Sequence, residues 1–327
     1  MRTKASLVLA FALSLAAQPA WADPLTRVTI NGSATPVYFN DGDSFRIQAG
    51  PMKGAQARLS GYNTLESFGP AHSWGTWTTK ELYAVAKLAT LTARRGSWSC
   101  EGDGKKDGYG RLLLFCRDLA LQLIQQGLAH NFSVDATPGD AELQQAQRQA
   151  MKAGIGMWAH GVPRFVMTSL HSKAEGGDKH GKTSNRLIST TDAHSDKWEH
   201  EDDYAECQNV CHQVPGMTAA DVDANLAQLK GASALGALSD DDARVVIKAG
   251  GEAILRGYAK PTLADLEVTG VDLPGSLDQA ALAPLLAGLA RLQESKALAV
   301  TGKQNDSCQV FVDFRRRFGG ERAVCLR

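Results

Sequence analysis

The sequence predicts an α+β protein in which a five-stranded β-barrel with added helices precedes a polar linker and a small helix-rich unit. Three observations lead to this fold class. Apolar and polar residues alternate in short stretches between residues 26 and 61, as expected of half-buried strands. Apolar residues then recur at helical spacing from Thr78 to Thr92. Over residues 171–203 the composition becomes polar and poor in aliphatic side chains, which separates the two halves.

Residues 23–165 are predicted to form the barrel and its helices. Turns at Asn31-Gly32 and Asp41-Gly42 divide the first part into a meander of strands, and Gly127 and Gly154 are placed to end two helices. The predicted strands lie within 26–49 and at 56–61, 98–100 and 112–116, and the predicted helices at 78–92, 119–130 and 141–153. Five short strands with a helix inserted before the fourth are typical of an OB-type barrel with added helices.

The second half is predicted to consist of a polar linker or extension over 166–203 and a helix-rich, disulfide-containing region over 204–327. Its helices are recognised from their N-caps and apolar spacing. The predicted helices begin after Thr218, after Ser239 and after a capping box of Ser276 and Gln279, and run to Leu229, Leu255 and Leu292. Strand-like segments follow at 297–300, 308–314 and 323–326.

The first 22 residues resemble a secretory signal peptide. Arg2 and Lys4 precede a short apolar run, and residues 20–22 form an A-x-A cleavage site. This run is too short to span a bilayer, and no later stretch approaches eighteen apolar residues. We therefore expect an exported protein, periplasmic or secreted, without a membrane span.

The six cysteines of an exported chain indicate disulfide bonds. Cys100 and Cys116 flank a turn rich in Gly, Asp and Lys, and we expect them to pair across a hairpin. The remaining four allow three connectivities, and the sequence does not choose among them. These four are Cys207, Cys211, Cys308 and Cys325.

Charged residues of chemical interest gather at residues 41–66, although the chain as a whole is neutral, with 35 basic and 35 acidic residues. A nucleic-acid ligand would therefore need a local basic cleft. Asp41 and Asp43 lie at a tight turn, and Arg58 and Glu66 follow. Such a set suits a divalent cation and a phosphate ester. By themselves, the same residues are also compatible with a hairpin carrying ordinary surface charges.

The motifs DGDSF, RLSGYNTLE and DGYGR, followed by helices ending in QQGLA and GIGMW, resemble the staphylococcal nuclease (thermonuclease) family. The resemblance covers about residues 26–160, and the C-terminal half is not recognised. It implies a calcium site, two arginines on the scissile phosphate and a glutamate that activates water. The implied residues are Asp43, Asn63 and Thr64 for the metal with Asp41 in the outer shell, Arg58 and Arg111 for phosphate, and Glu66 as base. Tyr109 is placed to stack on a nucleotide ring.

Two positions depart from the family pattern. Asn63 stands where the family has a second calcium carboxylate, and Leu65 stands where it has a proline. Asparagine can still offer a carbonyl oxygen, but the site loses a negative charge worth about 4 kcal/mol gross per unit charge at 4 Å and an effective dielectric of 20. We therefore expect weak calcium binding. Leu65 removes only a backbone constraint on Glu66.

The resemblance implies an exported, calcium-assisted nuclease that hydrolyses phosphodiester bonds of single-stranded DNA or RNA and leaves 3′-phosphates. The alternative is a catalytically degenerate barrel of the same fold that binds nucleic acid or protein. Asn63 is the residue that keeps this alternative open.

Overall fold

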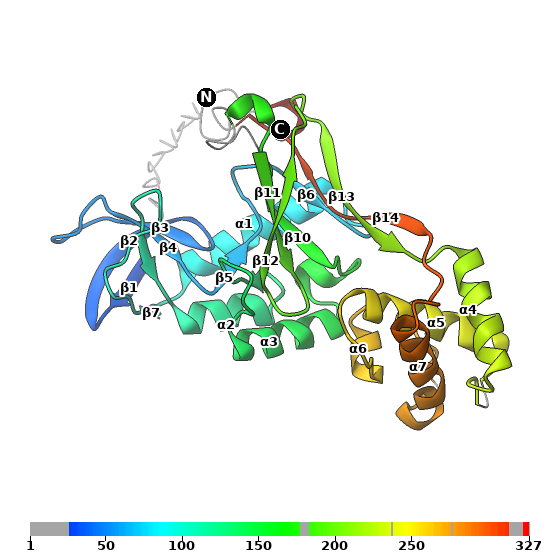
Figure 1. Ribbon diagram of the computed structural model, residues 1–327. Helices are drawn as coiled ribbons and strands as arrows, with labels where there is room; N and C mark the ends of the chain where they lie inside the picture. Colours follow the sequence, from blue (N-terminus) through cyan, green and yellow to red (C-terminus); the bar gives the residue numbers. More distant parts are fainter. Residues whose placement is uncertain (1–25, 177–182, 237, 276, 314–322, 327) are drawn as a thin grey trace, which may run out of the picture.

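The computed structural model describes residues 26–176, 183–236, 238–275, 277–313 and 323–326. It has a mixed α+β structure in which a curled sheet with helices, a second sheet and a helical unit follow one another across the molecule (Figure 1). The predicted signal segment, residues 1–22, lies outside the described residues. Among the helices of the described ranges, none is long and apolar enough to cross a membrane.

The curled sheet has the strand order β7-β1-β2-β3-β4-β8, with parallel pairs at both edges and antiparallel pairs between them. Its strands are β1 (Thr26–Ile30), β2 (Ser33–Asp41), β3 (Ser44–Ile47), β4 (Gln56–Leu59), β7 (Trp98–Cys100) and β8 (Leu112–Leu114). Just past the edge strands, Glu101 and Phe115 exchange backbone hydrogen bonds of 2.9 and 2.7 Å, so the two edges meet. The sheet has six strands where the sequence predicted five, because residues 26–47 form three strands instead of two.

The inner face of this sheet forms the largest apolar core of the N-terminal half. Phe39 and Phe45 are fully buried there, and each such side chain stabilises the fold by about 1.5–3 kcal/mol. The accompanying helices are α1 (Thr79–Arg95), α2 (Arg117–Gln125) and α3 (Ala141–Lys152). Thr78 begins α1 through a capping box with Glu81. The predicted disulfide between Cys100 and Cys116 is confirmed and joins the ends of both edge strands.

A second sheet occupies the segment predicted as a polar linker. It is antiparallel, with the order β10-β11-β12, and consists of β10 (Phe165–Ser169), β11 (Thr183–Ser189) and β12 (Ser195–His200). The prediction of an irregular linker is therefore wrong for these residues. Composition misled it because the strands contribute only a few buried apolar side chains, such as Met167 and Leu187, and polar contacts add to them. Gln144 of α3, for example, donates to the carbonyls of Thr190 and Thr191 at 2.9 and 2.8 Å.

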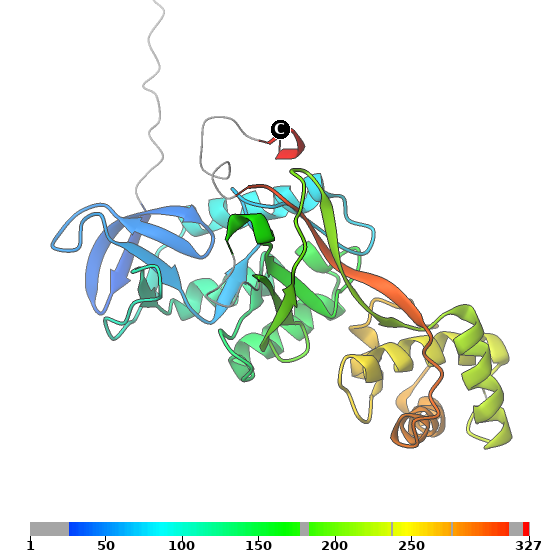
Figure 2. The same ribbon diagram turned by 45° about the horizontal axis from the view of Figure 1, so that its top comes forward.

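A third sheet joins a short strand of the N-terminal half to two strands of the C-terminal half. Its order is β13-β14-β6, formed by β6 (His72–Ser73), β13 (Asn209–Gly216) and β14 (Gly302–Val310). Figures 1 and 2 show β13 and β14 running together from the centre of the molecule to the helical unit. Two disulfides, Cys211–Cys308 and Cys207–Cys325, select one of the three open connectivities.

Strand boundaries near the C-terminus differ from the sequence prediction. Residues 297–300, which are described, do not form the predicted strand, and β14 begins at Gly302. Residues Val324–Leu326 form a short 3-10 helix instead of a strand. Cys211 lies in β13 opposite Cys308, so it does not share a helix face with Cys207.

The helical unit consists of α4 (Ala219–Gly231), α5 (Asp240–Leu255), α6 (Leu263–Glu267) and α7 (Gln279–Glu294). Thr218 and Ser239 are the N-caps of α4 and α5, as predicted. Asp278 caps α7, and the predicted partner Ser276 lies outside the described residues. Leu226, Val246 and Leu285 belong to a core of this unit's own, separate from that of the curled sheet.

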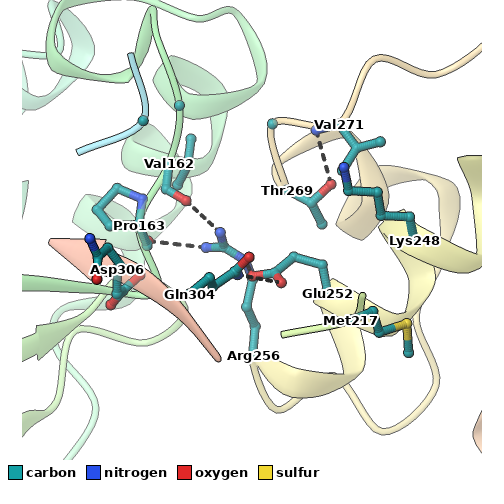
Figure 3. A pocket seen from close by; sticks show the side chains of 14 residues that line it. Val162, Pro163, Met217, Lys248, Glu252, Arg256, Thr269, Val271, Gln304 and Asp306 are labelled. Carbon is teal, nitrogen blue, oxygen red and sulfur yellow. Dashed lines mark hydrogen bonds and ion pairs between the residues drawn. The ribbon is translucent and has the colours of Figure 1, made fainter. Parts of the chain in front are cut away.

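Buried charges hold the helical unit against the rest of the molecule around a cavity of about 390 Å³ (Figure 3). Arg256, which directly follows α5, donates to the carbonyls of Val162 and Pro163. Glu252, one turn earlier, accepts two hydrogen bonds from Arg164, at 2.7 and 2.6 Å. The Arg164 side chain is 4% exposed and that of Glu252 is 14% exposed. Glu252 therefore compensates two buried guanidinium groups.

The substitution Glu252→Gln should lower the free energy of unfolding by about 3 kcal/mol, because breaking a buried ion pair leaves the remaining charge uncompensated. Urea unfolding of the two proteins at neutral pH measures this difference. Glu294→Gln, which removes an exposed carboxylate from the end of α7, is the matched control. Equal losses in the two variants would contradict a special role for Glu252.

The difference in unfolding free energy between wild type and Glu252→Gln should depend on pH. Burial acts to raise the pKa of Glu252, but the hydrogen bond from Arg164 and the charges of Arg256 and Arg164 outweigh it, so the pKa falls below its ordinary value of 4.5. A carboxylate with a lowered folded pKa contributes fully above its unfolded pKa and loses that contribution as the pH falls through the folded value. The difference between wild type and Glu252→Gln should therefore shrink below about pH 4.5.

Candidate functional site

The sequence-predicted residues at positions 41–66 come together at one end of the curled sheet. Asp43 lies in the turn between β2 and β3, and Arg58 on β4 is paired with Ser44 of β3. The chain then turns into β5 (Tyr62–Thr64), which pairs with β9 (Ala129–Asn131). Gly42 is needed in the turn, because a Cβ atom there would lie 2.5 Å from Thr64 Cγ2. The glycine of the DGD motif thus lets β5 pass close to the acidic turn.

Asp43 is the centre of a buried polar network and is 3% exposed. Its Oδ1 forms an ion pair with Arg58 Nη1, and its Oδ2 accepts from the Thr64 amide at 2.8 Å and from Thr64 Oγ1 at 3.2 Å. The second terminal nitrogen of Arg58 donates to Asn63 Oδ1. Asn63 Nδ2 donates in turn to the Thr64 carbonyl at 2.9 Å. One guanidinium thus bridges two side chains that the family resemblance assigns to the metal.

Asp41 and Glu66 add negative charge next to this network. Burial raises the pKa of Asp41 well above its usual range, and the charges of Asp43 and Glu66 raise it further. For Arg58, burial acts to lower the pKa, but the charges of Asp43, Asp41 and Glu66 outweigh it, and the net pKa is raised. The structure therefore brings Glu66 within electrostatic reach of Arg58 and both aspartates.

The main chain at Glu66 is held by residues that sequence reasoning missed. The Glu66 amide donates to His72 Nε2 at 3.3 Å. His72 is neutral at physiological pH, because burial, with the charge of His130, lowers its pKa to about 3. Gln309 Nε2, from β14, lies 3.3 Å from both ring nitrogens of His72 and donates to the Met167 carbonyl at 2.8 Å. No sequence signal links positions 72 and 309, which are 237 residues apart.

Arg111 and Tyr109 lie on a separate loop between β7 and β8. Arg111 Nε bonds to Asp107 Oδ2 at 2.7 Å, and its guanidinium carbon lies 5.5 Å from the centre of the Tyr109 ring. Tyr109 is 86% exposed, which suits a surface that receives a planar ligand. Within the described residues, no direct contact joins Arg111 to Asp43 or Arg58. Each of the two predicted phosphate-binding arginines is therefore paired with an aspartate of its own.

The oxygen atoms near Arg58 have the chemistry of a calcium site but are already engaged. Asp43, Asn63 and the Thr64 carbonyl are hard oxygen donors, and Asp41 and Glu66 supply further negative charge nearby. Only one of the three direct donors is a carboxylate, and over the described ranges no cluster of three or more His, Cys, Asp or Glu side chains suits a metal ion. These residues fit a weak calcium site in which the ion competes with Arg58 for two donors.

Part of the N-terminal half matches a known protein family. Residues 57–160 match the family described as staphylococcal nuclease homologue. The family resemblance is thus confirmed for this part of the chain, and we call residues 26–160 the nuclease-like domain. The match includes Arg58, Glu66 and Arg111, whereas Asp41 and Asp43 precede it. None of the curated proteins matches the chain.

The substitution Arg58→Gln should destabilise the protein by about 3 kcal/mol, because it leaves the Asp43 carboxylate buried without its counter-charge. Chemical unfolding in the presence of a metal chelator measures this loss. The control is Arg46→Gln on β3, where the arginine is exposed and no ion pair is found among the described residues. Unchanged stability of Arg58→Gln would contradict the bridging role of Arg58.

Proposed function

We propose that this protein is an exported nuclease that hydrolyses phosphodiester bonds of single-stranded DNA or RNA. The observation that carries the proposal is the position of Arg58 between Asp43 and Asn63 with Glu66 within electrostatic reach, in a domain that matches the staphylococcal nuclease homologue family. The three disulfides support the export, because such bonds persist in oxidising compartments.

Arg58 is suited to receive the phosphate that is cleaved. Its two terminal nitrogens donate side by side to two oxygen acceptors, which is the geometry with which a guanidinium binds a phosphate group. A bound phosphate would exchange with Asp43 and Asn63 for these donors. Arg111, on the exposed loop, would hold another phosphate oxygen, and Tyr109 would stack on a base.

Glu66 is the proposed general base. Its carboxylate would take a proton from the attacking water, and the charge that develops on the phosphate oxygens would be met by Arg58. The hydrogen bond from the Glu66 amide to neutral His72 fixes the main chain from which this carboxylate extends. Positioning of the base thus depends on a residue outside the recognised motifs.

Calcium is the proposed cofactor. Asp43, the side-chain oxygen of Asn63 and the Thr64 carbonyl would hold it, with Asp41 in the outer shell. When bound, the ion would polarise a phosphoryl oxygen. The affinity should be low, because Asn63 carries no charge and Arg58 competes for the donors.

A catalytically silent binding module is the second candidate function. The contact between Arg58 and Asn63 favours this function. Asp43 and the neutral Asn63 both bind the arginine, so neither oxygen is free to bind a metal ion. Such a module would bind a nucleic acid or a protein and would show neither turnover nor stabilisation by calcium.

Cleavage of labelled single-stranded DNA and RNA, with millimolar calcium or with a chelator, tests the enzyme directly. We expect calcium-dependent cutting that falls about 10²- to 10⁴-fold in Glu66→Gln, which is the usual contribution of a general base. Glu101→Gln, an exposed carboxylate in the same domain, should retain activity. Absence of cleavage in wild type, or full activity in Glu66→Gln, would overturn the proposal.

The substitution Asn63→Asp should strengthen calcium binding about tenfold or more, because it adds a negative charge among the donors. The shift of thermal unfolding with calcium concentration measures the affinity without any need for turnover. Asn209→Asp adds the same charge on exposed β13 and should leave calcium affinity unchanged. If Asn63→Asp created cleavage that wild type lacks, the binding module would be the correct assignment.

A further inference from the structure

An arginine from outside the family match lies beside the candidate site. Arg186 is on β11, and its guanidinium carbon is 5.8 Å from the centre of the Phe132 ring. The guanidinium carbon of Arg58 is also 5.8 Å from the centre of that ring. Phe132 directly follows β9, and its amide donates to the Gly61 carbonyl at 3.0 Å. The proposed phosphate-binding Arg58 and an arginine of the second sheet thus lie near the same aromatic ring.

Main-chain hydrogen bonds fix the second sheet at this position. The Ser133 amide donates to the Ala193 carbonyl at 2.8 Å, and the Ser195 amide donates to the Asp135 carbonyl at 2.7 Å. These bonds connect the residues that follow Phe132 with the turn and strand that follow β11. Because they involve the backbone on both sides, they hold the second sheet next to the segment that carries Phe132.

The charge on this face of the second sheet is not balanced by direct ion pairs. Lys197 on β12 is directly opposite Arg186 on β11, and both side chains are exposed. Like charges at directly opposite positions destabilise a sheet. In the part of the chain that the structure describes, neither residue forms an ion pair with a carboxylate; Glu199 lies further along, opposite Ser184. An anionic ligand would relieve this repulsion.

Electrostatics within the site agree with this placement. Burial lowers the pKa of Arg186, and the positive charge of Arg58 lowers it further. The two arginines are therefore close enough to repel each other. Tyr109 on the exposed loop also interacts electrostatically with Arg186, which places an aromatic ring that can stack on a base near the same arginine.

We propose that Arg186 and Lys197 form a subsite for a backbone phosphate next to the one that Arg58 receives. The proposal rests on the proposed nuclease function and extends it: the ligand is a single-stranded oligonucleotide that crosses from the nuclease-like domain onto the second sheet. Phe132, which lies near both arginines, is the aromatic side chain closest to the intervening nucleotide. A small phosphodiester with a single phosphate would not reach this subsite.

Binding of a short fluorescent single-stranded DNA to the mature protein in a chelator, at several salt concentrations, tests the subsite without turnover. Arg186→Gln should weaken binding about five- to tenfold and reduce the slope of log K against log salt by about 0.7, because one phosphate contact is lost. Arg186→Lys should keep the slope, since it keeps the charge. Lys260→Gln, with the same charge change on an exposed residue of the helical unit, should bind like wild type.

The outcomes separate the two proposals. If wild type binds and cleaves DNA but Arg186→Gln has the salt slope of Lys260→Gln, the subsite is wrong and the nuclease stands. A lower melting temperature of Arg186→Gln with an unchanged slope would likewise assign Arg186 to packing against Phe132 only. If wild type neither binds nor cleaves any nucleic acid, both proposals fail. Selective loss of binding in Arg186→Gln, with hydrolysis of a small phosphodiester unchanged, is the result expected for the subsite.

Discussion

The antiparallel pairing of β14 with β6 is the contact on which the arrangement of this molecule depends. β14 comes near the end of the chain, and β6 follows shortly after Glu66, so the pairing connects the C-terminal half to the proposed catalytic loop. Within this pairing, Gln309 contacts His72, and His72 accepts a hydrogen bond from the Glu66 amide. The Cys211–Cys308 disulfide then ties β14 to β13. The C-terminal half therefore supports the site directly and is more than an appended module.

Charge compensation is the second constraint on the site. Arg58 contacts Asp43 and lies in the field of Asp41 and Glu66, which together raise its pKa against the effect of burial. Asn63 limits the number of carboxylates that one guanidinium must balance, and it still accepts a hydrogen bond from Arg58. Asn63 thus stabilises the site without metal through its contact with Arg58. In the proposed calcium site, the ion would compete with Arg58 for the oxygen atoms of Asp43 and Asn63.

Much of the nuclease-like domain could be predicted because its signals are local. The helices α1 to α3 and the Cys100–Cys116 pair each follow from residues within one element or one turn. In the helical unit, the caps Thr218 and Ser239 could be predicted for the same reason. The predictions failed where pairing is between distant segments. β10 to β12 were predicted as a linker because composition reveals neither their hydrogen bonds to α3 and to the loop after β9 nor the distant apolar residues against which Met167 and Leu187 pack.

The sequence by itself determined the fold class, the family of residues 57–160, and the identity of Asp43, Arg58 and Glu66 as neighbours near one turn. Spacing along the chain is sufficient there, because short strands return the chain to the same edge of the sheet. Only the tertiary structure decided that Arg58 bridges Asp43 and Asn63. It also showed that Arg111 forms an ion pair with Asp107, and that His72 and Arg186 lie next to the site. These contacts depend on side-chain direction and on strand pairing across long separations, and neither leaves a periodic signal in the sequence.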